Sequence, residues 1–156
     1  MKLYHSSTVA VTNPDVLHSR DFLDFGKGFY LTSIHEQAVK YAQRFIRRNR
    51  DAWLNCYEFE CDWSAWNVCR FDTYNKEWLQ FVAKCRVGKD DTDYDIVIGG
   101  IANDKVIQTI DRYFEGELSE GEALGFLKYE RPNIQYCIRS QSLLDRCLKY
   151  LESEQL

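Results

Sequence analysis

The chain has 156 residues, about the length of one domain, and 45% of them are hydrophobic and 15% aromatic. Large apolar side chains recur from one end to the other, which excludes disorder as the main state. The formal net charge of -4 argues against a protein that holds nucleic acid by bulk electrostatics, because such binding requires Lys and Arg to neutralise several phosphates. We therefore expect one folded domain over residues 1–156.

The sequence predicts neither a membrane segment nor an export signal. The longest apolar stretches, such as residues 96–102, are too short to cross a bilayer. The first residues lack the apolar run and the cleavage site of a signal peptide. We therefore expect a cytoplasmic protein with no membrane partner.

Six cysteines raise the question of disulfides or zinc. Structural disulfides are rare in a reducing compartment, no two cysteines have C-x-x-C spacing, and all three histidines precede the first cysteine. These observations predict free thiols and no metal site. Cys137 and Cys147 lie within apolar-periodic segments and are expected to be small buried side chains.

The first third of the chain predicts two strands and a helix. Residues 2–5 form a short strand, residues 12–24 a loop, and residues 25–32 two glycines that lead into an apolar strand. Ser33 and a glutamate three residues later match a capping box, so a helix should follow and end near Asn49. The residues expected on its buried face are Ala38, Tyr41, Ala42, Phe45 and Ile46.

The rest of the chain mixes strands and helices. The expected strands cover residues 53–60, 94–98 and 134–139, and the expected helices cover 75–86, 103–114, 119–129 and 141–153. Asn103 is an N-cap, and Ser119 with Glu122 repeats the capping-box pattern. Without regular β-α-β alternation, this order favours an α+β fold.

Three features of the sequence each allow both a structural and a functional interpretation when taken alone. His5 can be a partly buried strand-end histidine that a nearby hydroxyl or carbonyl satisfies. The glycines at 26 and 28 indicate a tight turn, or a close approach of the backbone to another strand or a ligand. A basic cluster near the end of the first helix favours a solvated helix end over a phosphate-binding patch. It consists of Arg44, Arg47, Arg48 and Arg50.

Two segments become more informative together. Residues 4–7 (YHSS) place a histidine before small hydroxyl residues on a first strand, and residues 26–33 (GKGFYLTS) place Gly-x-Gly-aromatic-Tyr before a serine and an alanine-containing helix. This order resembles the ADP-ribosyltransferase superfamily, in its diphtheria-toxin and poly(ADP-ribose) polymerase branch. The whole chain, with residues 93–99 (DYDIVIG), also looks like a set of small bacterial proteins of unknown function assigned to that superfamily.

The resemblance implies split antiparallel β-sheets flanked by helices, and a site for NAD. In the family, the histidine bonds a hydroxyl of the adenosine ribose, the tyrosine ring stacks on nicotinamide, and backbone groups beside the histidine hold the carboxamide. Carried over, His5 and Tyr30 would face each other across one cleft, with Tyr41 as a second stacking wall. The NAD-binding residues implied in this way are His5, Ser6, Gly28, Tyr30 and Tyr41.

The third family element is a glutamate near the start of a later strand, which bonds the 2′-hydroxyl of the nicotinamide ribose and stabilises an oxocarbenium-like transition state. Residues 135–139 (QYCIR) fall at this place, so the chain offers Gln135 instead. A glutamine oxygen can accept the hydroxyl hydrogen bond but carries no negative charge. Candidates to supply that charge are Glu58, Asp95 and Glu130.

The resemblance thus implies an NAD-dependent mono-ADP-ribosyltransferase that makes single transfers, with Gln135, His5 and Tyr30 as catalytic residues and NAD as co-substrate. The acceptor is open between a protein side chain, a nucleic acid and a small molecule. The similar bacterial proteins imply a toxin with a cognate antitoxin. Two alternatives stay open: a catalytically weak module that binds NAD or ADP-ribose, and an interaction domain in which Phe29 or Trp78 fills the cleft.

Overall fold

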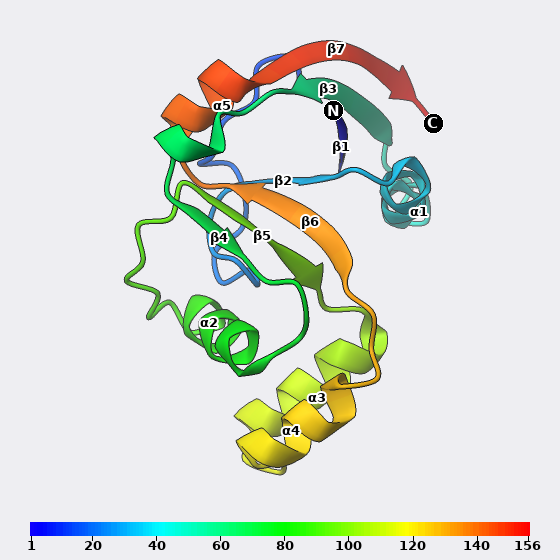
Figure 1. Cartoon of the computed structure of the whole chain (residues 1–156). Helices are drawn as coiled ribbons and strands as arrows, with labels where there is room; N and C mark the ends of the chain where they lie inside the picture. The colour runs from blue at the N-terminus through cyan, green and yellow to red at the C-terminus, as the bar shows by residue number, and fades with distance from the viewer.

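The computed structural model describes all of residues 1–156 and contains seven strands and five α-helices (Figure 1). The strands are β1 (Lys2–Ser7), β2 (Phe29–Thr32), β3 (Trp53–Phe59), β4 (Val68–Arg70), β5 (Ile96–Ile101), β6 (Asn133–Ile138) and β7 (Leu148–Gln155). The helices are α1 (His35–Ile46), α2 (Lys76–Arg86), α3 (Asp104–Phe114), α4 (Glu120–Leu127) and α5 (Gln141–Cys147), with a short 3-10 helix at Trp63–Ala65. The mixed order confirms the α+β class.

All seven strands form one sheet in the order β4-β5-β6-β2-β1-β3-β7. Neighbouring strands are antiparallel except β4 and β5, which are parallel. The expectation of two split sheets is corrected to one sheet with a weak seam, because β1 and β2 share a single residue pair, Tyr4 with Thr32. Figure 1 shows that β1 runs across the direction of β2 at this seam.

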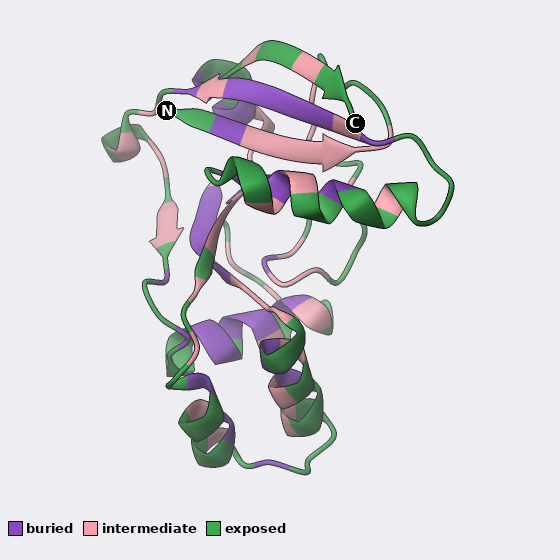
Figure 2. Cartoon of the chain, turned by 90° about the vertical axis from the view of Figure 1, so that its right-hand side faces the viewer, coloured by how far each residue is buried: buried purple, intermediate pink, exposed green.

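The sheet separates two clusters of buried apolar side chains. The first cluster lies between helices α2, α3 and α4 and the sheet face that carries Val97 and Cys137. The second packs α5 against the opposite face, which carries Phe29 and Ile138. Tyr30, next to Phe29 on β2, packs against the first cluster, as the alternation of a strand requires. Figure 2 shows buried residues along the strands and the inner sides of the helices.

Helix α1 begins without the predicted capping box. Its N-cap residue is Ile34, which has no side-chain oxygen, and Ser33 makes no capping hydrogen bond. The hydroxyl oxygen of Thr32 instead accepts a hydrogen bond from the backbone N–H of Ile34 at 3.1 Å. The start of α1 is therefore tied to the last residue of β2.

The buried face of α1 is narrower than the periodicity predicts. Only Ala38 and Ala42 are buried in this helix, while Tyr41 and Ile46 are each 40% exposed. The helix also ends at Ile46, before the predicted end near Asn49. Small residues on the inner face let α1 lie close to β1.

Two other helix starts are confirmed. The side chain of Asn103 accepts a hydrogen bond from a backbone N–H three residues later. Ser119 and Glu122 form a complete capping box at the start of α4. Gly116, with a φ of 77°, follows the end of α3 and supplies the left-handed conformation that stops it.

The last predicted helix is wrong in its second half. Periodicity predicts a helix over residues 141–153, but α5 ends at Cys147 and the chain continues as β7. β7 pairs with β3 from Leu148, opposite Phe59, to Gln155, opposite Trp53. This pairing gives backbone partners to the whole segment, and tertiary context overrides its helical propensity.

None of the helices has both the length and the apolar character that a membrane span requires. All six cysteines are free thiols, and Cys137 and Cys147 are buried as predicted. The structure holds no group of three or more His, Cys, Asp or Glu side chains placed to bind one metal ion.

Replacing Gly28 with alanine should destabilise the sheet. A Cβ at this position would lie 2.6 Å from the backbone oxygen of Ile138 and 2.7 Å from Sγ of Cys137. Strand β6 would have to shift, so we expect the free energy of unfolding in urea to fall by about 1–3 kcal/mol. The control Gly125→Ala has nothing within 4 Å and lies on an exposed face of α4. It should gain about 0.5–1 kcal/mol. A Gly28→Ala protein as stable as the wild type would contradict this contact.

Candidate functional site

The three candidate catalytic residues come from three neighbouring strands. His5 lies on β1, Tyr30 on β2 and Gln135 on β6, and these strands are adjacent in the order β6-β2-β1. Tyr30 is paired with Cys137, and Thr32 with Gln135. Because paired residues project to the same face, Tyr30 and Gln135 lie on one face of the sheet as diagonal neighbours.

The ring of His5 is fixed at the seam between β1 and β2. Its Nδ1 lies 2.8 Å from the backbone oxygen of Tyr30. A carbonyl oxygen only accepts, so Nδ1 carries the proton. Burial lowers the pKa of His5, although the bond to Tyr30 opposes this shift. At neutral pH the imidazole is therefore uncharged, and its Nε2 is a hydrogen-bond acceptor with no partner in the protein.

The rings of His5 and Tyr30 do not face each other across one cleft. The His5 ring packs against the ring of Phe29, with centroids 4.3 Å apart. Phe29 belongs to the second apolar cluster, whereas Tyr30 packs against the first. The expected ring-to-ring arrangement is therefore corrected: the two residues meet through the Tyr30 backbone, and their rings lie on opposite sides of β2. The Phe29 ring lies against His5, as the interaction-domain alternative predicts. Trp78, the other residue named in that alternative, lies in the first cluster.

The Tyr30 side chain is held by the turn that precedes β2. Its hydroxyl donates to the backbone oxygen of Gly26 at 2.5 Å and accepts from the backbone N–H of Phe25 at 3.1 Å. Burial raises the pKa of Tyr30 far above its ordinary value, so the phenol stays protonated. Gly26 has a φ of 77°, which a side chain would disfavour, so the turn requires glycine here.

The remaining predicted NAD-binding residues have structural partners. The Ser6 hydroxyl donates to the backbone oxygen of Ala38 at 2.6 Å and ties β1 to α1. Tyr41 is exposed on α1, with the Arg44 guanidinium 4.9 Å from its ring centroid. The close approach predicted at Gly28 is to strand β6.

The side-chain amide of Gln135 has no hydrogen-bond partner in the protein. The residue is half-buried, and its amide makes no hydrogen bond within the protein. Glu58 lies on β3, two strands away from β2, and pairs with the N-terminal amine. Asp95 precedes β5 and accepts from the backbone N–H of Asn67 at 2.8 Å. Glu130 precedes β6 and makes no bond to Gln135. None of these three carboxylates therefore hydrogen-bonds to Gln135.

Sequence reasoning missed two further residues beside Gln135. Thr32 pairs with Gln135 in the sheet, and its hydroxyl donates to the side-chain oxygen of Gln37 on α1 at 3.0 Å. A glutamine in the first turn of a helix ordinarily indicates solvent, so its type gave no signal. The chain order of strand, turn and helix was the only sign that α1 starts next to this face.

The four arginines at the end of α1 are exposed, and none forms an ion pair. This placement agrees with the solvated helix end favoured from the sequence.

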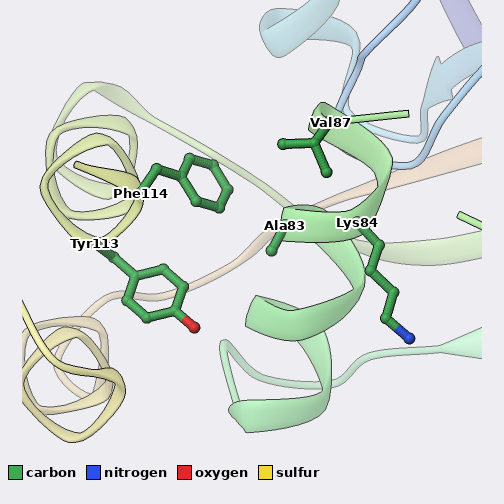
Figure 3. A pocket seen from close by; sticks show the side chains of 5 residues that line it. All are labelled: Ala83, Lys84, Val87, Tyr113 and Phe114. Atoms are coloured by element: carbon green, nitrogen blue, oxygen red, sulfur yellow. The ribbon is translucent and has the colours of Figure 1, made fainter. Parts of the chain in front are cut away.

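Two surface hollows lie away from the candidate residues. One, of about 380 Å³, is bounded by α2 and α3 and lined by Ala83, Lys84, Val87, Tyr113 and Phe114 (Figure 3). The other, of about 640 Å³, lies between β3, α5 and β7 and is lined mainly by charged residues such as Glu58 and Asp145. The first is largely apolar and contains no carboxylate, thiol or imidazole, which leaves it without a group for acid–base or nucleophilic chemistry.

Comparison with known families gives one result. The family described as "Protein of unknown function (DUF3990)" matches residues 1–150, so the chain belongs to this family. No curated protein and no solved structure gives a significant match. The matched region includes β1, β2, α1 and β6, and the family description assigns no activity.

The lowered pKa of His5 predicts a pH-dependent stability. The unfolded chain binds a proton at this histidine near pH 6.5, whereas the folded protein binds it only at lower pH. The contribution of His5 to the free energy of unfolding is therefore fully present above pH 6.5. It falls as the pH drops towards the folded pKa, with a slope of at most about 1.4 kcal/mol per pH unit. In His5→Asn, whose amide can still donate to Tyr30, this part of the slope should vanish. Urea unfolding between pH 5 and 8 measures it, and equal slopes for the two proteins would rule the assignment out.

Proposed function

We propose that this protein is an NAD-dependent mono-ADP-ribosyltransferase with an ADP-ribosyltransferase-like fold. One observation carries the proposal. His5, Tyr30 and Gln135 are far apart in the chain, correspond by resemblance to that superfamily, and come from three adjacent strands; Tyr30 and Gln135 share one face, and His5 contacts the Tyr30 backbone from the other side of β2.

The chemistry of His5 supports a role in binding a ribose. Its Nδ1 proton is used by the Tyr30 backbone, which leaves Nε2 as an acceptor that a sugar hydroxyl can satisfy. The stable tautomer means that no proton has to move before the ligand binds. Tyr30 contributes its backbone oxygen, which holds the His5 ring, while its own ring packs against the first apolar cluster.

The proposed reaction transfers ADP-ribose from NAD to an acceptor. The bond between C1′ of the nicotinamide ribose and the nicotinamide nitrogen breaks, and nicotinamide leaves with the electron pair. A nucleophile on the acceptor then bonds to C1′ and releases its proton. The Gln135 oxygen can orient the 2′-hydroxyl, but it offers no negative charge to the cationic transition state. Single, slow transfers to an already nucleophilic acceptor follow from this substitution.

The resemblance further suggests a bacterial toxin that a cognate antitoxin holds in check. The acceptor can be a protein, a nucleic acid or a small molecule. We place the action inside the cell, with NAD as co-substrate and without a metal.

A binding module without turnover is the second candidate. It is favoured by Gln135 in place of the family's glutamate, since none of the three candidate carboxylates hydrogen-bonds to this residue. Such a module would bind NAD or ADP-ribose and release no nicotinamide.

Titration calorimetry with NAD, followed by mass spectrometry after incubation with NAD, separates these functions. Saturable binding together with nicotinamide release or an added ADP-ribose supports the transferase. Binding alone supports the module. Absence of saturable NAD binding would overturn both and leave the interaction domain.

Replacing Gln135 with glutamate should raise the turnover of NAD. The carboxylate keeps the acceptor for the ribose hydroxyl and adds the negative charge that the transition state lacks. We expect nicotinamide release to rise by about tenfold or more. The control Gln108→Glu adds the same charge on an exposed position of α3 and should change nothing. Equal rates in both variants would contradict a role for Gln135 at the reacting ribose.

A further inference from the structure

One buried side-chain nitrogen has no hydrogen-bond partner, and it belongs to Gln37 on α1. The oxygen of the same amide accepts from the Thr32 hydroxyl, which in turn accepts from the backbone N–H of Ile34. The Thr32 hydroxyl gives its single proton to the Gln37 oxygen, so the Gln37 nitrogen takes no part in this contact. Both N–H donors of Gln37 are left unpaired. Buried donors are nearly always paired, so this one requires a reason.

Thr32 links the unpaired amide to the strand position of Gln135. Thr32 is opposite Gln135 in the antiparallel pair of β2 and β6, which puts their Cβ atoms about 5 Å apart on one face. On its other side Gln135 is paired with Gly99, which contributes no side chain. Two glutamine amides thus flank Thr32, and neither the nitrogen of Gln37 nor any atom of the Gln135 amide is used by the protein.

The pair is suited to neutral hydroxyl groups. An anionic ligand would be bound best by a cation, but the arginines of α1 begin at Arg44, about 10 Å further along the helix axis. Vicinal hydroxyls both donate and accept, which matches one free amide oxygen and one free amide nitrogen. The last torsion of a glutamine side chain is soft, so a small rotation can turn the Gln37 nitrogen towards a ligand over Thr32.

We propose that Gln37 and Gln135 form an amide pair that binds the two ring hydroxyls of the nicotinamide ribose. The Gln135 oxygen accepts from one hydroxyl, and the Gln37 nitrogen donates to the oxygen of the other. This inference rests on the proposed function and adds Gln37 to it as a residue that selects a ribose with both hydroxyls. It also gives the unpaired donor its partner in the complex.

The test combines a protein variant with a ligand variant. Calorimetry measures the affinity of wild type and Gln37→Met for NAD and for two NAD analogues, whose nicotinamide ribose lacks either the 2′- or the 3′-hydroxyl. We expect Gln37→Met to lose about five- to tenfold in affinity for NAD, the value of one neutral hydrogen bond. Its affinity for the analogue that lacks the Gln37-bound hydroxyl should be unchanged. Gln43→Met, exposed on the same helix, should match the wild type for every ligand.

Each outcome has a distinct meaning. A similar loss of affinity for NAD and both analogues would show that Gln37 only supports the structure. No loss of affinity at all would show that Gln37 does not touch the ribose. Either result overturns the amide pair and leaves the proposed function standing. A wild-type protein that does not bind NAD overturns both. If Gln37→Met does not fold, Gln37→Glu replaces it, because this variant keeps an acceptor for Thr32 and removes both N–H donors. Its affinities for NAD and the two analogues are compared in the same way.

Discussion

The site depends on the seam between β1 and β2. A single residue pair and the hydrogen bond from His5 to the Tyr30 backbone join the two halves of the sheet there. Helix α1 reinforces the seam from the side, because Ser6 of one half bonds to Ala38 and Thr32 of the other half bonds to Gln37. Burial beside the Phe29 ring lowers the pKa of His5 and keeps the imidazole neutral, although the hydrogen bond to Tyr30 opposes this shift.

Much of the fold follows from local signals in the sequence. The caps at Asn103 and Ser119 satisfy the N–H groups of their own helices, so a few neighbouring residues suffice to predict them. The end of the chain could not be predicted in this way. The segment after Cys147 becomes β7 because β3 offers it a partner, and that partner lies far away in the sequence. The missed three-residue β4 likewise exists through its pairing with β5.

The strand positions of the candidate residues were predictable from the sequence, whereas the orientations of their side chains were not. The family resemblance selected residues that lie on neighbouring strands of the sheet. The direction of the His5 and Tyr30 rings depends on which face of β2 enters each apolar cluster, and Phe29 decides this by packing into the second. Gln37 carries no sequence signal, because its unpaired nitrogen arises only when Thr32 takes the other end of the amide.

The two outer strands of the sheet have a consequence for how this protein meets copies of itself. An outer strand exposes unpaired backbone groups that can recruit a further strand from another molecule. β4 has only three residues, which is too short to template such an addition. β7 is long, but it carries the charged side chains of Glu152 and Glu154, which disfavour pairing with a flat, apolar strand of another molecule. The segment that the sequence predicts as the end of a helix is thus an edge strand whose charges oppose the addition of a further strand.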